Sequence, residues 1–159
     1  MSQLESLKIK IYADGADLGG MLAMHADPRI AGFTTNPTLM RKAGVLDYET
    51  FAKKVLEHIP DRPISFEVFA DDFDEMERQA RRIAAWAPNV NVKIPIMNTK
   101  GELATRIVER LSGDGITVNV TAIMTIDQVR AVAAALHIDS SAIVSVFAGR
   151  IADTGRDPI

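Results

Sequence analysis

Six short runs rich in β-branched residues alternate with longer segments of helical period, and this alternation constrains the fold more than any other feature of the sequence. The runs cover residues 8–13, 31–35, 64–70, 90–96, 116–122 and 143–148. Strands that alternate with helices pair in parallel through right-handed crossovers. The sequence therefore predicts an α/β domain of repeated strand–helix units, undivided over residues 1–159.

The segments between the runs carry apolar residues at helical spacing. The predicted helices, with their expected starts, are residues 48–59 after the N-cap Asp47, residues 73–84, residues 103–111 after a capping box of Thr99 and Glu102, residues 126–136 after Thr125 and Gln128, and a short helix after Asp17. Side chains such as Asp47 and Thr125 accept hydrogen bonds from the first backbone N–H groups of a helix, which would otherwise lack partners.

The fourth run, residues 90–96, has an alternation that singles out Lys93. Its even positions are all valine or isoleucine, whereas Lys93 stands among the odd positions. Successive strand side chains point to opposite faces, so Lys93 is predicted to face away from the aliphatic side. The other runs show a comparable parity.

In a parallel barrel the outer strand face packs on the helices, the inner face lines the barrel, and catalytic groups lie near the carboxyl ends of the strands. Each of the six runs places one polar residue there: Asp14, Asn36, Glu67, Lys93, Thr121 and Ser145. We therefore expect a (β/α)8 TIM-barrel type of fold, of which this chain holds about six βα units. The structural alternative is a six-stranded doubly wound sheet with helices on both faces.

Composition excludes several classes of function. A formal net charge of −3 gives no broad basic field, so neither nucleic acid nor a membrane surface is expected as a partner. The absence of cysteine excludes disulfides, thiolate catalysis and cysteine-bound zinc, and suits a cytoplasmic location. No glycine-rich nucleotide loop and no metal-ligand spacing occurs, so we expect a cofactor-free protein without a metal site.

Lys93 carries the strongest chemical signal. Burial disfavours the charged form of lysine, and the neutral amine can attack a carbonyl carbon. Glu67 on the neighbouring strand could transfer the protons that imine formation requires. Taken alone, Lys93 could equally be a lysine whose stem is buried and whose amine reaches water, and Glu67 its plain ion-pair partner. Arg150, after the last run, suits a phosphate or carboxylate clamp, with a surface salt bridge as the alternative.

The sequence resembles the transaldolase family, including its smaller fructose-6-phosphate aldolase-like branch. The matching stretches are residues 12–17 (YADGAD), 32–38 (GFTTNPT), 66–68 (FEV), 91–95 (NVKIP), 115–121 (GITVNVT) and 145–151 (SVFAGRI). Together they cover most of the chain in order. One departure is Gly15, where the family often has threonine or serine.

This resemblance implies a barrel that transfers a dihydroxyacetone unit from a ketose phosphate to an aldehyde acceptor without a cofactor. It implies that Lys93 forms the Schiff base and that Asp14 is the acid/base at the cleaved carbon's hydroxyl. It further implies that Glu67 and Thr121 hold a catalytic water. The expected substrate-binding residues are Thr34, Asn36, Asn119, Ser145 and the phosphate-binding Arg150. Because the aldolase branch tends to carry glutamine at position 67, Glu67 favours transfer over simple aldol cleavage.

The resemblance also implies that the family's last two βα units are absent, as expected of a truncated chain. Unpaired strand edges invite pairing with other chains, so we expect a homo-oligomer or reduced stability. Two other functions stay open. One is fructose-6-phosphate aldolase-like cleavage or aldol chemistry on another donor, and the other is a non-catalytic sugar-phosphate binding or assembly subunit.

Overall fold

The computed structural model describes residues 8–158, which divide into two compact units, one ending at Ile64 and the other beginning at Ser65. The first unit contains β1 (Ile11–Gly15), α1 (Leu18–His25), β2 (Ile30–Thr35), α2 (Pro37–Lys42) and α3 (Tyr48–His58). The boundary falls inside β3 (Ile64–Glu67). The second unit continues with α4 (Phe73–Ala84), β4 (Val90–Pro95), α5 (Thr105–Gly113), β5 (Val118–Ile123), α6 (Ile126–Ala135), β6 (Ala142–Val146) and α7 (Ala148–Asp153).

The strands follow one another in sequence order, β1-β2-β3-β4-β5-β6. The pairs β1–β2, β4–β5 and β5–β6 are parallel. A doubly wound sheet would reverse its strand order partway, which this sheet does not do. The structure therefore confirms the expected α/β fold of barrel type with six βα units.

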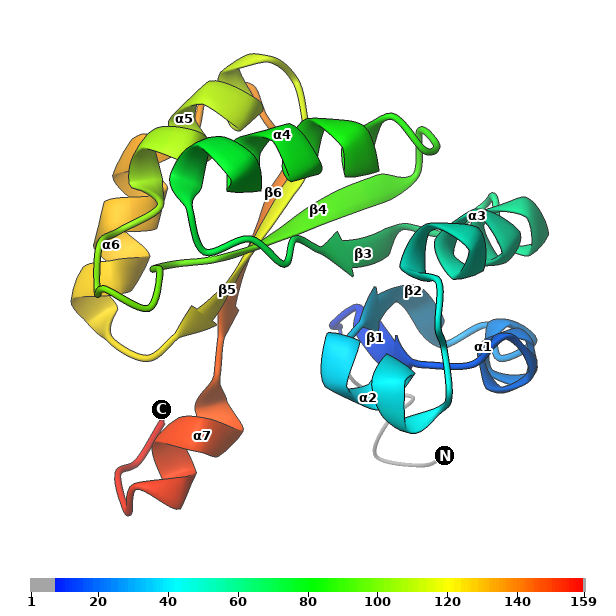
Figure 1. Cartoon of the computed structure of the whole chain (residues 1–159). Helices are drawn as coiled ribbons and strands as arrows, with labels where there is room; N and C mark the ends of the chain where they lie inside the picture. The colour runs from blue at the N-terminus through cyan, green and yellow to red at the C-terminus, as the bar shows by residue number, and fades with distance from the viewer. Residues whose placement is uncertain (1–7, 159) are drawn as a thin grey trace. The chain divides into compact units, whose positions relative to one another are not determined.

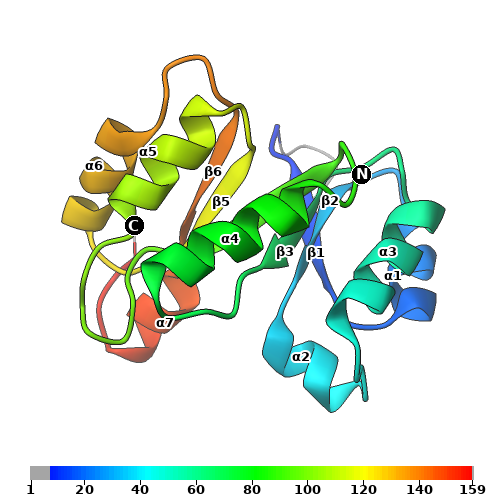
Figure 2. The same ribbon diagram turned by 45° about the horizontal axis from the view of Figure 1, so that its top comes forward.

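In the second unit, α4, α5 and α6 lie on the same side of β4, β5 and β6, as both ribbon views show (Figures 1 and 2). Consecutive right-handed crossovers place successive helices on one face when strands are added in one direction. The helices bury the aliphatic strand positions Val92, Ile94 and Val120, which are fully buried. Phe66 packs edge-on against Trp86, with ring centroids 5.6 Å apart.

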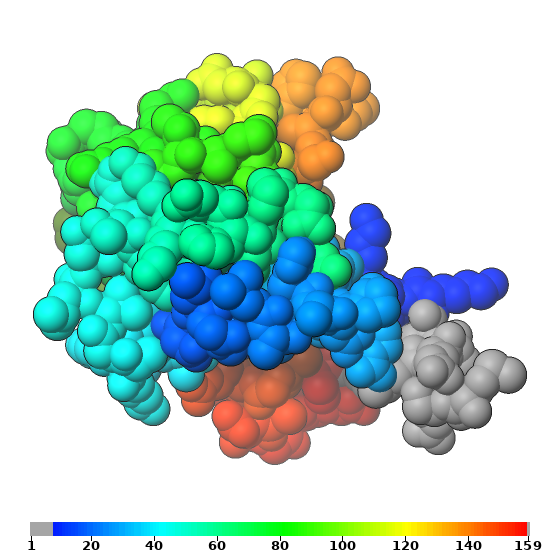
Figure 3. Space-filling view, turned by 90° about the vertical axis from the view of Figure 1, so that its right-hand side faces the viewer, coloured from blue at the N-terminus to red at the C-terminus, as the bar shows by residue number. Residues whose placement is uncertain are grey.

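In the first unit, α1 and α3 lie side by side, and the space-filling view shows them as neighbouring blue and blue-green surfaces (Figure 3). Asp17 caps α1 and Asp47 caps α3, both through their side chains, as predicted. Gly15 precedes α1 where a Cβ atom would lie 2.4 Å from Cγ of Met21, which is fully buried. The space that a side chain at position 15 would need is therefore filled by Met21.

One local prediction is wrong. The capping box of Thr99 and Glu102 does not form, since α5 begins at Thr105 after Ala104, with no side-chain cap. Thr99 is bound instead by Asp71, 28 residues earlier in the chain. The Asn-Pro pair forms the start of α2, in which Pro37 takes the first position and Asn36 is the N-cap. Proline suits that position because the first N–H groups of a helix have no intrahelical partner.

The predicted run 116–122 is corrected at both ends. The strand β5 begins at Val118, and its pairing with β6 shifts between Val120 and Ile123. Within that shift Ala122 adopts a φ of 61°, which is uncommon for a residue with a side chain. Regular alternation therefore ends at Thr121, the last polar residue of the strand. The other strands differ from the predicted runs by a few residues at their ends.

Candidate active site

Lys93 and Glu67 form a largely buried ion pair in the second unit. Lys93 lies in the middle of β4 with only 9% of its side chain exposed, and its Nζ is 3.3 Å from Oε2 of Glu67, the last residue of β3. The backbone N–H of Val68 donates to the carbonyl of Lys93, which fixes the two strands in register beside the pair. An amine and a carboxyl group at this distance can exchange a proton directly.

The surroundings of Glu67 alter its acidity. Burial raises the pKa of this carboxyl above its usual range, and the attraction and hydrogen bond of Lys93 oppose the rise only in part. Desolvation penalises the charged form of a carboxyl group, whereas a nearby cation favours it. Glu67 therefore keeps its proton to higher pH than an exposed glutamate does.

Thr121 lies on β5 with its side chain buried. Within the described part of the chain, its Oγ1 has no hydrogen-bond partner. A buried hydroxyl without a partner is costly. Thr121 stands next to Ala122, whose left-handed backbone turns the chain at this point. The position suits a hydroxyl that binds a water molecule or a substrate atom.

Asn119 on β5 lies directly opposite Lys93 on β4, since the two residues are register partners. Its Oδ1 accepts a hydrogen bond from Ser145 on β6 at 2.8 Å. Its Nδ2 donates to Ser65 on β3 at 3.0 Å. These two bonds fix which end of the amide is the donor. Ser65 was not among the predicted site residues, although it shares a strand face with Glu67.

In the first unit, Asp14 and Thr34 are paired across β1 and β2, and the hydroxyl of Thr34 donates to Oδ1 of Asp14. Asp14 is exposed and does not cap a helix, because that role belongs to Asp17. Asn36 uses its Oδ1 to accept the N–H groups of Thr38 and Leu39 at the start of α2. Its amide group remains a potential donor to a ligand.

Arg150 lies on α7 with 73% of its side chain exposed, and its NH1 is 3.7 Å from Oδ2 of Asp153. The contact is a loose surface pair, of the kind that contributes little to stability. The guanidinium group can therefore turn towards an anion without loss of a buried interaction. A surface salt bridge is the alternative that the sequence leaves open for Arg150, and the structure shows such a pair with Asp153.

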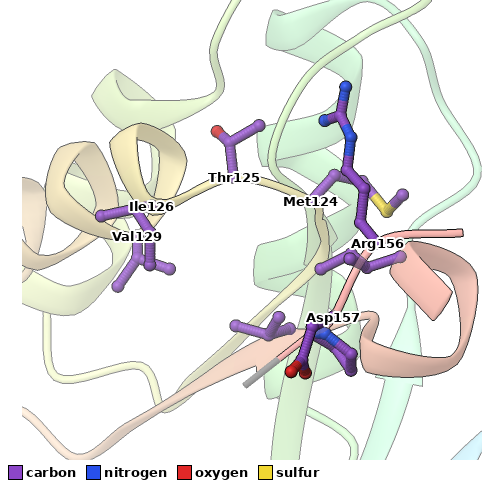
Figure 4. A pocket seen from close by; sticks show the side chains of 9 residues that line it. Met124, Thr125, Ile126, Val129, Arg156 and Asp157 are labelled. Carbon is purple, nitrogen blue, oxygen red and sulfur yellow. The ribbon is translucent and has the colours of Figure 1, made fainter. Parts of the chain in front are cut away.

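The apolar hollow of the second unit lies elsewhere. It has a volume of about 260 Å³ and lies between the start of α6 and the chain that follows α7 (Figure 4). Its lining residues are Met124, Thr125, Ile126, Val129, Val146, Ile151, Arg156, Asp157 and Pro158. None of the nine predicted site residues lines it, so we do not assign the chemistry to this hollow.

Neither a metal cluster nor a membrane helix appears in residues 8–158. No group of three or more His, Asp or Glu side chains there is placed to hold a metal ion. No helix among those residues has the length and apolar character to cross a bilayer.

Fold and site together define a class: α/β proteins of barrel type with a lysine in the middle of a strand and a carboxyl group beside it. The family described as transaldolase/fructose-6-phosphate aldolase matches residues 11–158, and the chain belongs to this family. This finding confirms the resemblance on which the sequence analysis relied.

Curated relatives agree. The chain is 41% identical over 128 residues to a probable transaldolase of Dehalococcoides mccartyi. This match covers 80% of this chain and 56% of the relative. It is 39% identical over 150 residues to a probable transaldolase of Streptococcus equi, and 40% identical over 149 residues to one of Streptococcus pyogenes. Both of these matches cover 94% of this chain and 65% of the relative. The chain thus spans 56–65% of the length of these relatives.

Proposed function

We propose that this chain carries the Schiff-base chemistry of a transaldolase, which transfers a dihydroxyacetone unit from a ketose phosphate to an aldehyde acceptor. The observation that carries the proposal is the buried pair of Lys93 and Glu67, 3.3 Å apart on adjacent strands. The membership of the family and the printed names of the relatives support the same reaction class.

Imine formation begins when Lys93 passes a proton to Glu67. The neutral amine then attacks the ketone carbon of the donor, and the carbonyl oxygen takes up the proton that the attacking nitrogen loses, which gives a carbinolamine. Glu67 returns a proton to the carbinolamine hydroxyl, which leaves as water while the carbon–nitrogen double bond forms. A carboxyl group whose pKa is raised by burial can both accept and return that proton. The hydroxyl of Thr121, buried and without a protein partner in the described residues, suits the water through which these protons pass.

Carbon–carbon cleavage follows from the imine. Asp14 takes the proton of the donor hydroxyl at the bond to be broken, and the electron pair of that bond moves into the imine to give an enamine. The first aldehyde leaves, and the enamine attacks the acceptor aldehyde to form the new bond while Asp14 returns its proton to the aldehyde oxygen. Water then hydrolyses the resulting imine, which releases the product and frees Lys93. Thr34 supports this role of Asp14, because its hydroxyl donates to the carboxylate and orients it. The assignment of Asp14 rests on the likeness to the family.

The remaining predicted residues are proposed to bind substrate. The amide of Asn119, oriented by Ser145 and Ser65, keeps one N–H free of those two bonds for a donor hydroxyl. The amide group of Asn36 could serve in the same way, since its oxygen is used by α2. Arg150 would bind a phosphate group through its planar guanidinium.

Borohydride trapping tests the proposal. The protein is mixed with dihydroxyacetone or fructose 6-phosphate and reduced, and its intact mass is compared with that of Lys93→Met and of Lys100→Met. Lys100 is an exposed lysine on the loop after β4 and serves as the matched control. We expect an adduct in the unaltered protein and in Lys100→Met, and none in Lys93→Met. An unaltered protein that folds and binds fructose 6-phosphate without any adduct would support the non-catalytic binder instead.

Transfer and simple cleavage are distinguished by their products. A transaldolase needs an aldehyde acceptor to release the bound unit, whereas an aldolase releases free dihydroxyacetone without one. We expect turnover of fructose 6-phosphate to depend on the acceptor, because glutamate occupies position 67. Release of dihydroxyacetone at the same rate without an acceptor would favour the aldolase.

A further inference from the structure

The loops that follow β3 and β4 are joined by one carboxylate. Oδ1 of Asp71 accepts the backbone N–H of Thr99 at 2.7 Å, and Oδ2 accepts the Thr99 hydroxyl, also at 2.7 Å. Asp71 follows Glu67 by four residues, and Thr99 follows Lys93 by six. The two loops therefore leave the Glu67–Lys93 pair separately and meet again a few residues later.

Each loop is also fixed from within. Oε1 of Gln79 on α4 accepts the N–H groups of Phe69 and Ala70, at 2.8 and 3.0 Å. On the other loop, Oδ1 of Asn98 accepts the N–H groups of Lys100 and Glu102, at 3.1 and 2.9 Å. Because both loops are ordered by such bonds, the contact between Asp71 and Thr99 joins two stiff segments rather than two loose ones.

We propose that Asp71 and Thr99 are positioning residues, a latch that holds the end of β3 against β4 so that Glu67 stays beside Lys93. This inference rests on the proposed function, because the latch affects catalysis through the proton transfer between Glu67 and Lys93. It adds two residues that lie outside the predicted site and that touch neither reacting group.

The geometry explains why such a latch matters. The strand β3 is only four residues long and ends at Glu67 itself. Beyond it, the bond from Val68 to the carbonyl of Lys93 still joins the two chains. From Val68 onwards the chain is no longer part of the strand, so without a second attachment the end of β3 could separate from β4. A displacement of about 1 Å in a reacting group can lower a rate a hundredfold.

Charge and geometry must be separated in the test, because Asp71 lies among other charged groups. Asp72, Asp74, Lys100 and Glu102 line the same polar hollow, and Lys93 faces Glu67. Asp71→Asn removes the charge but keeps an oxygen for the Thr99 N–H and an NH2 group for its hydroxyl. Asp71→Ala removes both bonds. Asp74→Ala removes a nearby exposed carboxylate that makes no bond to Thr99, and is the matched control.

The first measurement needs no turnover. A carbon-13 NMR titration of the Glu67 carboxyl group is recorded for the unaltered protein and the three variants, with thermal melts to establish folding. We expect the pKa of Glu67 to fall towards the usual glutamate range in Asp71→Ala, because the end of β3 opens to water. We expect it to stay raised in Asp71→Asn and Asp74→Ala. If Asp71→Ala fails to fold, Thr99→Val replaces it. We expect this variant to lower the pKa of Glu67 by a smaller amount, because it loses only the hydroxyl bond.

The second measurement is the rate of the borohydride-trapped adduct on Lys93. We expect a loss on the order of tenfold in Asp71→Ala and nearly the original rate in Asp71→Asn. An unchanged Glu67 titration in Asp71→Ala and Thr99→Val would overturn the latch, as would an equal shift in Asp71→Asn or Asp74→Ala. Absence of any adduct in the unaltered protein would overturn the proposed function alone, because the titration still decides whether the latch exists.

Discussion

At the scale of single residues, the proposed chemistry depends on a lysine that the fold keeps beside a carboxyl group in a poorly solvated place. Lys93 is 7% exposed as a whole residue, and Glu67 is half-buried beside it. Burial of a charged group is tolerated when a partner of opposite charge accompanies it. In the proposed mechanism, the short distance between the two groups also lets them exchange a proton.

Glu67→Gln tests the proton transfer. In the unaltered protein, the rate of adduct formation should rise with pH as Glu67 ionises. The midpoint of this rise should lie at a higher pH than the usual pKa of glutamate, because burial raises the pKa of Glu67. The folded protein holds this proton more tightly than the unfolded chain, so the contribution of Glu67 to stability falls as pH rises through the same window. The amide of glutamine cannot titrate. We therefore expect Glu67→Gln to form adduct at least tenfold more slowly and to lose the rise of the rate over this pH range.

The check is the pH profile of adduct formation, with Glu102→Gln as the control. Glu102 follows β4 on the adjacent loop and binds Asn98 rather than Lys93. If the rate of adduct formation in Glu67→Gln still rises over the same pH range, the role given to Glu67 is contradicted.

At the scale of the elements, the sequence was most informative where local chemistry decides the structure. The Thr125 and Gln128 capping box formed as predicted, because both partners lie within one turn. The similar pattern of Thr99 and Glu102 failed, because Asp71 from a distant part of the chain binds Thr99. Sequence spacing holds no information about such a competitor. The helix α2 is absent from the predicted helices, because its six residues are too few to show a helical period.

Thr125→Ala should weaken the start of α6. The side chain accepts the N–H of Gln128, and Gln128 in turn accepts the N–H of Thr125. Loss of an N-cap of this kind costs about 1 kcal/mol in the free energy of unfolding. Chemical denaturation should show this loss, whereas Thr125→Ser should retain most of the stability. Equal stability of Thr125→Ala and the unaltered protein would show that the capping box contributes nothing.

Gly15 is explained by packing between β1 and α1. The family often has threonine or serine at this position, and here the buried side chain of Met21 fills the space. We expect Gly15→Ala to destabilise the protein by about 1–3 kcal/mol, the usual cost of overpacking a core. Gly113→Ala is the control, because nothing lies within 4 Å of its added Cβ. The account is wrong if thermal melts place both variants at the temperature of the unaltered protein.

At the scale of the whole molecule, strand order and family membership were predictable, whereas side-chain contacts between distant elements were not. The order of the strands predicted that Lys93 and Glu67 lie on neighbouring strands, and the structure has them 3.3 Å apart. Parity could not show that Asn119 is held between Ser65 and Ser145, nor that β5 loses its regularity at Ala122. Those features arise from packing among strands that are far apart in sequence. The oligomeric state expected from the sequence stays a prediction.

The central claim is that Lys93 is the residue that forms the covalent bond to the donor. The most direct measurement is peptide mapping by mass spectrometry of the protein after reduction with borohydride in the presence of dihydroxyacetone. The account predicts that the added mass is confined to the peptide containing Lys93, and that it disappears when this residue is replaced by methionine. An adduct spread over exposed lysines such as Lys53 and Lys100, with Lys93 unmodified, would contradict it.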